Sequence, residues 1–198
     1  MIDAALAACA PAVSPVTLAA IIQVESAGQP LAININKGPR VALHRTAASA
    51  AQTARVWISK GHSVDLGLMQ VNSNNLARLG YTVEQMFDPC TNIRAGAAIL
   101  ASNYASAARR RGEGQTALRD ALSAYNTGSF VRGYNNGYVG KYFNLRPANI
   151  HVSSSVSAEL PRFADPYSAD TSVFSRKETE NAGTGPGVGS PTQPALFD

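Results

Sequence analysis

Glu25 is the carboxylate whose position in the sequence best suits acid–base chemistry. Leu18, Ile22 and Glu25 follow the i, i+4, i+7 spacing of one helix face, so the carboxylate should lie beside apolar side chains. It also falls in the last turn of the predicted helix, where burial and the helix dipole should both raise its pKa. A carboxyl group that is protonated near neutral pH can donate its proton to the leaving oxygen of a glycosidic bond. The plainer alternative, a partly exposed glutamate at a frayed helix end, remains open.

A second candidate lies in the six residues Gly67-Leu-Met-Gln-Val-Asn72. Gln70 and Asn72 carry amide donors and acceptors that suit sugar hydroxyl or acetamido groups. Gly67 would let a ligand approach the backbone closely. The alternative is a buried strand whose amides are hydrogen-bonded within the protein, and from these six residues alone it is the stronger interpretation.

Tyr125 and Asn126 close a further predicted helix, which carries Leu118, Leu122 and Tyr125 on one face. Taken alone, they fit a core tyrosine and a capping asparagine. The segment that follows interleaves aromatic and basic residues: Arg132, Tyr134, Tyr138, Lys141 and Tyr142. It could form a sugar-stacking rim, a nucleic-acid-binding face or ordinary helix packing.

The sequence does not contain the residue patterns that metal-dependent enzymes and triad hydrolases require. Cys9 and Cys90 form no Cys-x-x-Cys pair, and no histidine cluster accompanies them, so we expect neither a zinc site nor another cofactor. The two cysteines are either separate buried thiols or one disulfide formed in an oxidising compartment. Ser26 has no positioned histidine partner, which argues against a triad hydrolase.

The elements that must position these residues are mostly helical. We predict an α+β domain, predominantly α, over residues 1–147, since several helices surround one short non-helical stretch. The predicted elements are helices over 15–26, 46–60, 73–79, 88–111, 116–125 and 138–145, a small irregular hairpin over 34–43, and a non-helical segment over 64–72. No apolar run reaches the roughly 18 residues of a transmembrane helix.

The charge is unevenly distributed along the 198 residues. Residues 1–150 hold 14 Lys and Arg against 7 Asp and Glu, whereas residues 151–198 hold 3 against 6. The second part is rich in Ser, Thr, Gly and Pro, so we predict a low-complexity, flexible extension over 148–198. The basic first part suits an anionic partner such as nucleic acid, anionic lipid or an acidic cell-wall polymer.

Three motifs in this order resemble those of a known family. Glu25-Ser26, Gly67-Leu-Met-Gln70 with Asn72, and Ala124-Tyr-Asn126 look like the motifs of lytic transglycosylases with the lysozyme-like SLT fold. The transglycosylase subunit of type IV secretion and conjugation systems is more similar still. That likeness rests on Cys9-Ala-Pro, Val64-Asp-Leu-Gly, Cys90 and the segment from Ala124 to Val139, and it covers about residues 9–145.

The resemblance implies a substrate, peptidoglycan glycan strands, and a reaction at the β-1,4 bond between N-acetylmuramic acid and N-acetylglucosamine. Glu25 would protonate the glycosidic oxygen and then take the proton of the muramyl 6-hydroxyl, which attacks the anomeric carbon and leaves a 1,6-anhydro sugar. Such chemistry needs one glutamate, unlike two-carboxylate glycosidases. Asp65 is the acid beside a motif, and we expect it to be structural or substrate-adjacent.

The resemblance also assigns roles to individual positions. Ser26 would orient Glu25, Tyr125 would hydrogen-bond near it, and Tyr138 would support the site. Together with these three, the residues expected to bind substrate are Met69, Gln70, Asn72 and Asn126, of which Met69 and Gln70 would line the cleft. Cys9 and Cys90 would pair to tie the start of the Glu25 helix to the loop before the long helix. The implied location is the periplasm, with an export signal upstream of residue 1. Expected partners are other secretion-system components, without nucleic acid or stable membrane insertion.

Three other functions compete with this one. A hydrolytic lysozyme would act on the same polymer, and the sequence argues against it by lacking a convincing second carboxylate. A non-catalytic assembly factor would bind the wall or partner proteins through the same fold. A nucleic-acid-binding role would rest on charge and interleaved tyrosines alone.

Overall fold

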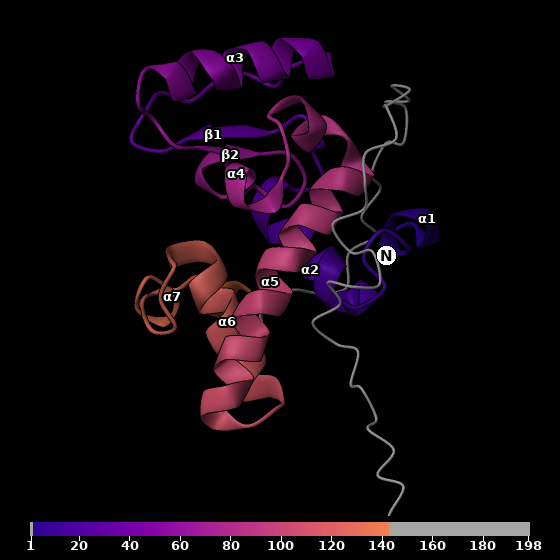
Figure 1. The fold of residues 1–198 in the computed structure, drawn as a ribbon, viewed down its shortest axis with the longest axis vertical. Helices are drawn as coiled ribbons and strands as arrows, with labels where there is room; N and C mark the ends of the chain where they lie inside the picture. Colours follow the sequence, from indigo (N-terminus) through magenta and orange to yellow (C-terminus); the bar gives the residue numbers. More distant parts are fainter. Residues whose placement is uncertain (1, 143–198) are drawn as a thin grey trace, which may run out of the picture. The chain divides into compact units, whose positions relative to one another are not determined.

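A single long helix, α5 (Pro89–Arg111), runs through the domain and carries the other elements on its sides (Figure 1). It begins where Asp88 caps it, with Oδ1 accepting the Thr91 N–H at 2.8 Å, and it ends at Gly112, whose φ is +79°. Its buried face includes Ile93 and Leu100.

The computed structural model describes residues 2–142, all within the first of the chain's two units, Met1–Arg162. The predicted boundary at residue 147 and the predicted extension over 148–198 lie outside the described residues.

The described elements are mostly helices, so the α+β, predominantly α prediction is confirmed. Besides α5 the helices are α1 (Ala4–Ala7), α2 (Pro15–Ser26), α3 (Ala47–Ser59), α4 (Leu76–Leu79), α6 (Gln115–Thr127) and α7 (Arg132–Asn135). The 3-10 turns are η1 (Ser73–Asn75), η2 (Glu84–Phe87) and η3 (Val139–Tyr142), and the strands are β1 (Ile33–Ile35), β2 (Val64–Leu66) and β3 (Val71–Asn72). Within residues 2–142 there is no helix both long and apolar enough to span a bilayer.

Two predicted elements are wrong in detail. The helix predicted over 138–145 is a 3-10 turn, η3, as far as the structure describes it, and the unpredicted helix α7 precedes it. The hairpin predicted over 34–43 does not form, because β1 pairs with β2, which lies beyond helix α3 in the sequence. Asn36 and Lys37 form a turn after β1, and Gly38 and Pro39 that follow do not continue into a second strand.

The small sheet has the order β1-β2-β3, with both pairs antiparallel. Its register sets Asn34 opposite Asp65, and Asp65 opposite Asn72. Side chains directly opposite each other on neighbouring strands share a face of the sheet. One row of polar side chains therefore crosses all three strands.

The turn between β2 and β3 is held from behind by Asn92 of α5, which is fully buried. Its Nδ2 donates to the carbonyls of Leu66 (2.8 Å) and Met86 (2.9 Å), and its Oδ1 accepts the Met69 N–H (2.8 Å). A Cβ on Gly67 would lie 2.4 Å from Asn92 Nδ2. The prediction that Gly67 admits a ligand is therefore wrong, since Asn92 makes the close approach.

Cys9 and Cys90 form a disulfide, with Cα atoms 5.4 Å apart. This settles the choice left open by the sequence. Cys9 follows α1, and Cys90 lies in the first turn of α5 and not in the loop before it. The bond thus joins the segment leading into α2 to the long central helix.

Candidate active site

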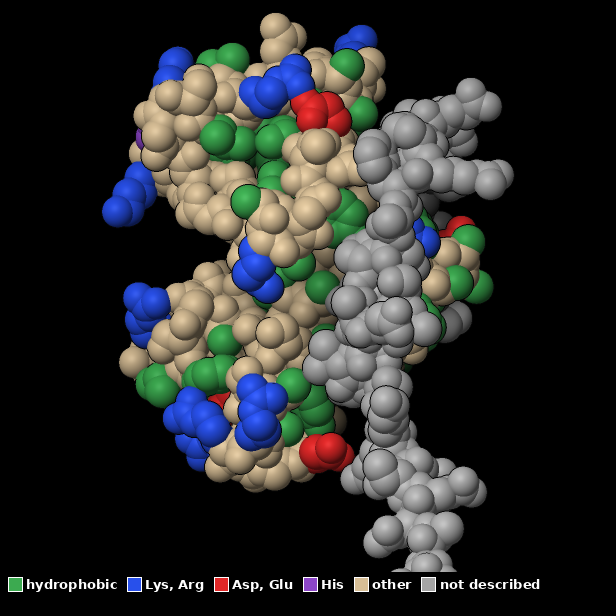
Figure 2. All heavy atoms as spheres, viewed as in Figure 1, with side chains coloured by type: hydrophobic (Ala, Val, Ile, Leu, Met, Phe, Trp, Pro, Cys, Tyr) green, Lys and Arg blue, Asp and Glu red, His purple; other side chains and the backbone are tan. Residues whose placement is uncertain are grey.

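A cavity of about 820 Å³ opens between the sheet and helix α6. In Figure 2 a notch in the surface separates two parts of the domain. One part contains α3 and the sheet, and the other contains α6 and α7. Its lining residues are dominated by side-chain amides: Asn34, Asn36, Gln70, Asn72, Asn74, Asn75, Asn103 and Asn126. Glu25 and Asp65 are the carboxylates in this lining, and Arg78 is the cation. Such a surface suits an uncharged ligand rich in hydroxyl and amide groups.

Glu25 reaches this cavity from the last turn of α2, which ends at Ala27 in the left-handed conformation (φ +51°). Leu18 and Ile22 of the same helix are fully buried, as the spacing predicted. Burial raises the pKa of Glu25 to about 7. The negative charge of Asp65 adds to this increase, whereas the Tyr138 hydrogen bond and the Lys141 charge oppose it. The predicted increase in pKa is confirmed, with burial as its main cause.

Tyr138 supports the Glu25 carboxylate directly. Its hydroxyl donates to Oε1 of Glu25, and the Tyr142 hydroxyl lies 2.5 Å from the Tyr138 oxygen. Because a phenol has one proton, and Tyr138 gives its own to Glu25, Tyr142 is the donor in the second bond. Tyr138 is 4% exposed, and burial raises its pKa well above the ordinary value, so it stays a donor.

Of the aromatic segment's open interpretations, packing fits best. Tyr138 and Tyr142 form an edge-to-face pair, with ring centroids 5.3 Å apart, behind Glu25. Tyr134 donates to Oδ1 of Asp120 at 2.7 Å. These tyrosines are engaged within the domain.

Tyr125 faces the cavity from α6, and its hydroxyl donates to the Met69 carbonyl at 2.7 Å. Met69 was predicted to line the cavity, but its side chain does not. Its side chain is fully buried against α5, where a Cβ on Gly96 would lie 2.7 Å from its sulfur. Met69 contributes to the site through its backbone, which positions Tyr125.

Ser26 also takes a different place from the one expected. Its hydroxyl donates to the Leu68 carbonyl at 2.7 Å, so it joins the end of α2 to the β2–β3 turn. Gln70 lines the cavity with φ at +47°, and its Nε2 donates to the Gly67 carbonyl at 2.8 Å. Asn126 lines it too, with Oδ1 accepting from Asn136 at 3.0 Å.

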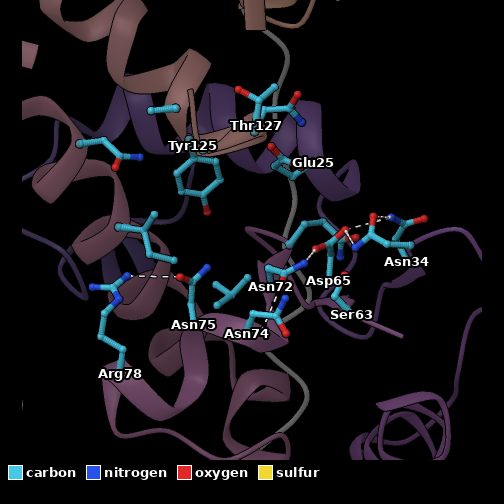
Figure 3. A pocket seen from close by; sticks show the side chains of 18 residues that line it. Glu25, Asn34, Ser63, Asp65, Asn72, Asn74, Asn75, Arg78, Tyr125 and Thr127 are labelled. Carbon is cyan, nitrogen blue, oxygen red and sulfur yellow. Dashed lines mark hydrogen bonds between the residues drawn. The ribbon is translucent and has the colours of Figure 1, made fainter. Parts of the chain in front are cut away.

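Asp65 is more central to the cavity than its sequence context indicated. Oδ2 accepts from Asn34 (2.9 Å) and Asn36 (3.0 Å), and Oδ1 accepts from Asn72 (2.6 Å). Asn34 and Asn36 had no place among the predicted site residues. Figure 3 shows Asp65, Asn34 and Asn72 facing Glu25 and Tyr125 across the pocket.

The family model described as "Transglycosylase SLT domain" matches residues 4–142. The chain belongs to this family. The SLT domain thus covers essentially all of the described residues, and its three motif regions contribute Glu25, Gln70 and Tyr125 to one cavity.

Named relatives of this SLT domain come from several bacteria. The chain is 45% identical to "Protein virB1" of Agrobacterium fabrum (strain C58) over 133 residues, 67% of this chain and 54% of the relative. It is 38% identical to "Protein virB1" of Rhizobium radiobacter over 171 residues, 86% of this chain and 67% of the relative. It is 42% identical to "Type IV secretion system protein virB1" of Brucella abortus biovar 1 (strain 9-941) over 127 residues, 64% of this chain and 53% of the relative. The matches to the Agrobacterium fabrum and Brucella proteins therefore span about half of those relatives, and no solved structure matches the chain significantly.

Proposed function

We propose that this protein is a peptidoglycan lytic transglycosylase whose acid and base is Glu25. The observation that carries the proposal is a half-buried carboxyl group, with its pKa raised to about 7, at the edge of a cavity lined mainly by amides. Membership of the SLT domain family supports the reaction class. The amides suit the hydroxyl and acetamido groups of glycan strands.

In the proposed reaction Glu25 gives its proton to the glycosidic oxygen as the bond to the anomeric carbon breaks. The ionised carboxylate is then stabilised by the Tyr138 hydrogen bond and by the charge of Lys141. It takes the proton of the muramyl 6-hydroxyl while that oxygen attacks the anomeric carbon. A pKa near neutrality allows one group to serve both steps.

The cellular role we propose is local opening of the wall for a type IV secretion or conjugation apparatus. It is supported by similarity to relatives whose names include "Type IV secretion system protein virB1". The proposed location is the periplasm, where peptidoglycan strands and other components of the apparatus would be the partners. The disulfide between Cys9 and Cys90 agrees with an oxidising compartment.

The test is mass spectrometry of sacculi digested by the wild type and by Glu25→Gln. We expect muropeptides with 1,6-anhydro ends from the wild type and none from the variant, since an amide cannot donate the required proton. Anhydro products from Glu25→Gln at the wild-type rate would remove Glu25 from the mechanism.

One observation favours a second candidate, a hydrolytic lysozyme. Asp65 shares the cavity with Glu25, so the site does contain a second carboxylate. In retaining and inverting glycosidases such a group acts as nucleophile or activates water. Products with reducing ends in the same assay would establish hydrolysis instead of transglycosylation.

A further inference from the structure

The carboxylate of Asp65 is fixed from three directions. Asn34 and Asn36 both donate to Oδ2, and Asn72 donates to Oδ1. The register of the sheet builds this arrangement, because Asn34, Asp65 and Asn72 stand directly opposite one another on β1, β2 and β3. Asn36 follows β1, and its own backbone N–H is bonded to the Ser63 carbonyl at 3.0 Å. We call these three asparagines the amide clamp.

The amide clamp holds a negative charge without cancelling it. Amide N–H groups are neutral donors, so Asp65 keeps its net charge while its orientation is fixed. A carboxylate has about four acceptor sites, and the clamp fills three of them. Asp65 is partly exposed and lines the cavity, so its remaining capacity is available to a ligand there.

Glu25 has a contrasting environment in the same cavity. The carboxyl group of Glu25 accepts a hydrogen bond from the Tyr138 hydroxyl, and burial favours the protonated form of Glu25. The cavity thus holds a carboxyl group with one side-chain donor, at Glu25, and a carboxylate with three, at Asp65. Glycosidic cleavage passes through a transition state in which positive charge develops on the sugar ring.

We propose that Asp65, held by the amide clamp, stabilises the positive charge that develops at the anomeric carbon when Glu25 protonates the leaving oxygen. This rests on the proposed glycan-cleaving function. The bond from the anomeric carbon to the leaving oxygen breaks with its electron pair on the oxygen, which receives the Glu25 proton. The muramyl 6-hydroxyl then bonds to the anomeric carbon, and its proton returns to Glu25. Asp65 exchanges no proton and forms no bond in this cycle.

The competing explanation is that Asp65 only ties the three strands together. It predicts lost stability on substitution, with unchanged turnover in the molecules that fold. The electrostatic role instead predicts a lower kcat at nearly unchanged KM, because the charge is needed mainly in the transition state. It also predicts a change at Glu25, whose pKa the Asp65 charge raises.

The decisive variant is Asp65→Asn, assayed on soluble uncrosslinked glycan strands at a temperature where it is folded. We expect kcat to fall about 100-fold or more, as when one group that stabilises transition-state charge is removed. The basic limb of the pH profile should move to lower pH, since Glu25 loses a neighbouring negative charge. A kcat within threefold of the wild type, or an unmoved limb, would overturn the proposal.

Asp120→Asn is the matched control. Asp120 is a buried carboxylate outside the cavity lining, bonded to Arg111 (2.8 Å) and Tyr134 (2.7 Å). Its substitution should lower the melting temperature and leave kcat and the pH profile of the folded enzyme unchanged.

A second variant keeps the proposal testable if Asp65→Asn does not fold. Asn36→Ala removes one of the two donors to Oδ2, and we expect kcat to fall about tenfold with KM nearly unchanged. In the Asp65→Asn background the same change should have no further effect, because residues that act as a unit are not additive. Full activity in Asn36→Ala, or additive losses, would overturn the positioning role of the amide clamp.

The outcomes separate this inference from the proposed function. Anhydro products from the wild type and their loss in Glu25→Gln would uphold the function even where Asp65→Asn is fully active. If the wild type releases no glycan products, both proposals fail together.

Discussion

The Tyr138 hydroxyl donates to Oε1 of Glu25 across a sequence separation of 113 residues. This bond brings the chain that follows α7 against the end of α2. It is also the strongest influence opposing the burial that raises the pKa of Glu25. Burial therefore keeps the carboxyl group protonated for the first proposed step, and Tyr138 makes the ionised form accessible for the second.

We expect kcat/KM on glycan strands to fall as the pH rises through about 7. Glu25 must be protonated to act as an acid, and its pKa is raised to about 7 by burial. Rate measurements at constant ionic strength from pH 4 to 9 would locate this limb. A plateau that continued to pH 9 would contradict an acid role for Glu25.

Tyr138→Phe should move the fall of kcat/KM, the basic limb of the pH profile, to higher pH. The hydrogen bond from Tyr138 favours the charged carboxylate, so its removal raises the pKa of Glu25. We also expect kcat to fall about 10- to 100-fold, since the ionised glutamate loses a charge-assisted bond on the order of 1.5–3 kcal/mol in strength. The pH–rate profile of the purified variant gives both quantities.

Tyr134→Phe provides the control for that experiment. It removes a phenolic hydroxyl whose bond goes to Asp120, away from Glu25. A small loss of stability, on the order of 1 kcal/mol, and an unmoved limb are expected. If both variants shifted the limb equally, the Tyr138–Glu25 bond would not be its cause.

Local patterns were sufficient to predict the long helices α2, α3, α5 and α6 and the environment of Glu25. Helix α2 begins at Pro15, as the sequence indicated, and the spacing of Leu18 and Ile22 correctly placed Glu25 on the buried face. The Tyr138 contact came from family resemblance alone, because no local periodicity connects residues so far apart. The helix predicted over 88–111 forms as α5, from Pro89 to Arg111.

The errors lie where the chain departs from regular alternation. The place of Met69 was carried over from the family resemblance, and it is wrong for the side chain, because Met69 lies in the turn between β2 and β3 and is buried there. The Ser26 hydroxyl is taken by the Leu68 carbonyl, which only the packed turn brings near. Asn34 and Asn36 were missed because their partner, Asp65, becomes their neighbour only when β1 pairs with β2.

Asn92→Ala should be among the most destabilising changes at a polar residue of this domain. The side chain is fully buried and bonds the backbone groups of Leu66, Met69 and Met86. Its loss would remove three hydrogen bonds to groups of the buried backbone, and we expect the free energy of unfolding to fall by about 3–5 kcal/mol. Urea unfolding would measure it.

The matched control for Asn92→Ala is Asn135→Ala at the exposed end of α7. That change should alter stability by no more than about 0.5 kcal/mol. Equal losses at the two positions would contradict the role assigned to Asn92.

Replacing both Cys9 and Cys90 by serine should lower the free energy of unfolding by about 2–4 kcal/mol, because the bond closes a long loop in the unfolded chain. The two residues are 81 positions apart and outside the cavity lining. Turnover of the folded variant should therefore be unchanged. Urea unfolding with and without reductant tests this, since reductant should weaken the wild type to the level of the variant and leave the variant unaffected.

Glu25→Gln, which we expect to be inactive, should be more stable than the wild type above neutral pH. The folded-state pKa of Glu25, about 7, exceeds its ordinary value of 4.5, so the folded protein binds this proton more tightly than the unfolded chain does. The resulting stabilisation is complete below pH 4.5 and is lost as the pH rises through 7. We therefore expect the variant to gain about 1–3 kcal/mol on the wild type at pH 8 and little at pH 4. Urea unfolding at both pH values measures the difference, and an equal gain at both would show that ionisation of Glu25 is not its source.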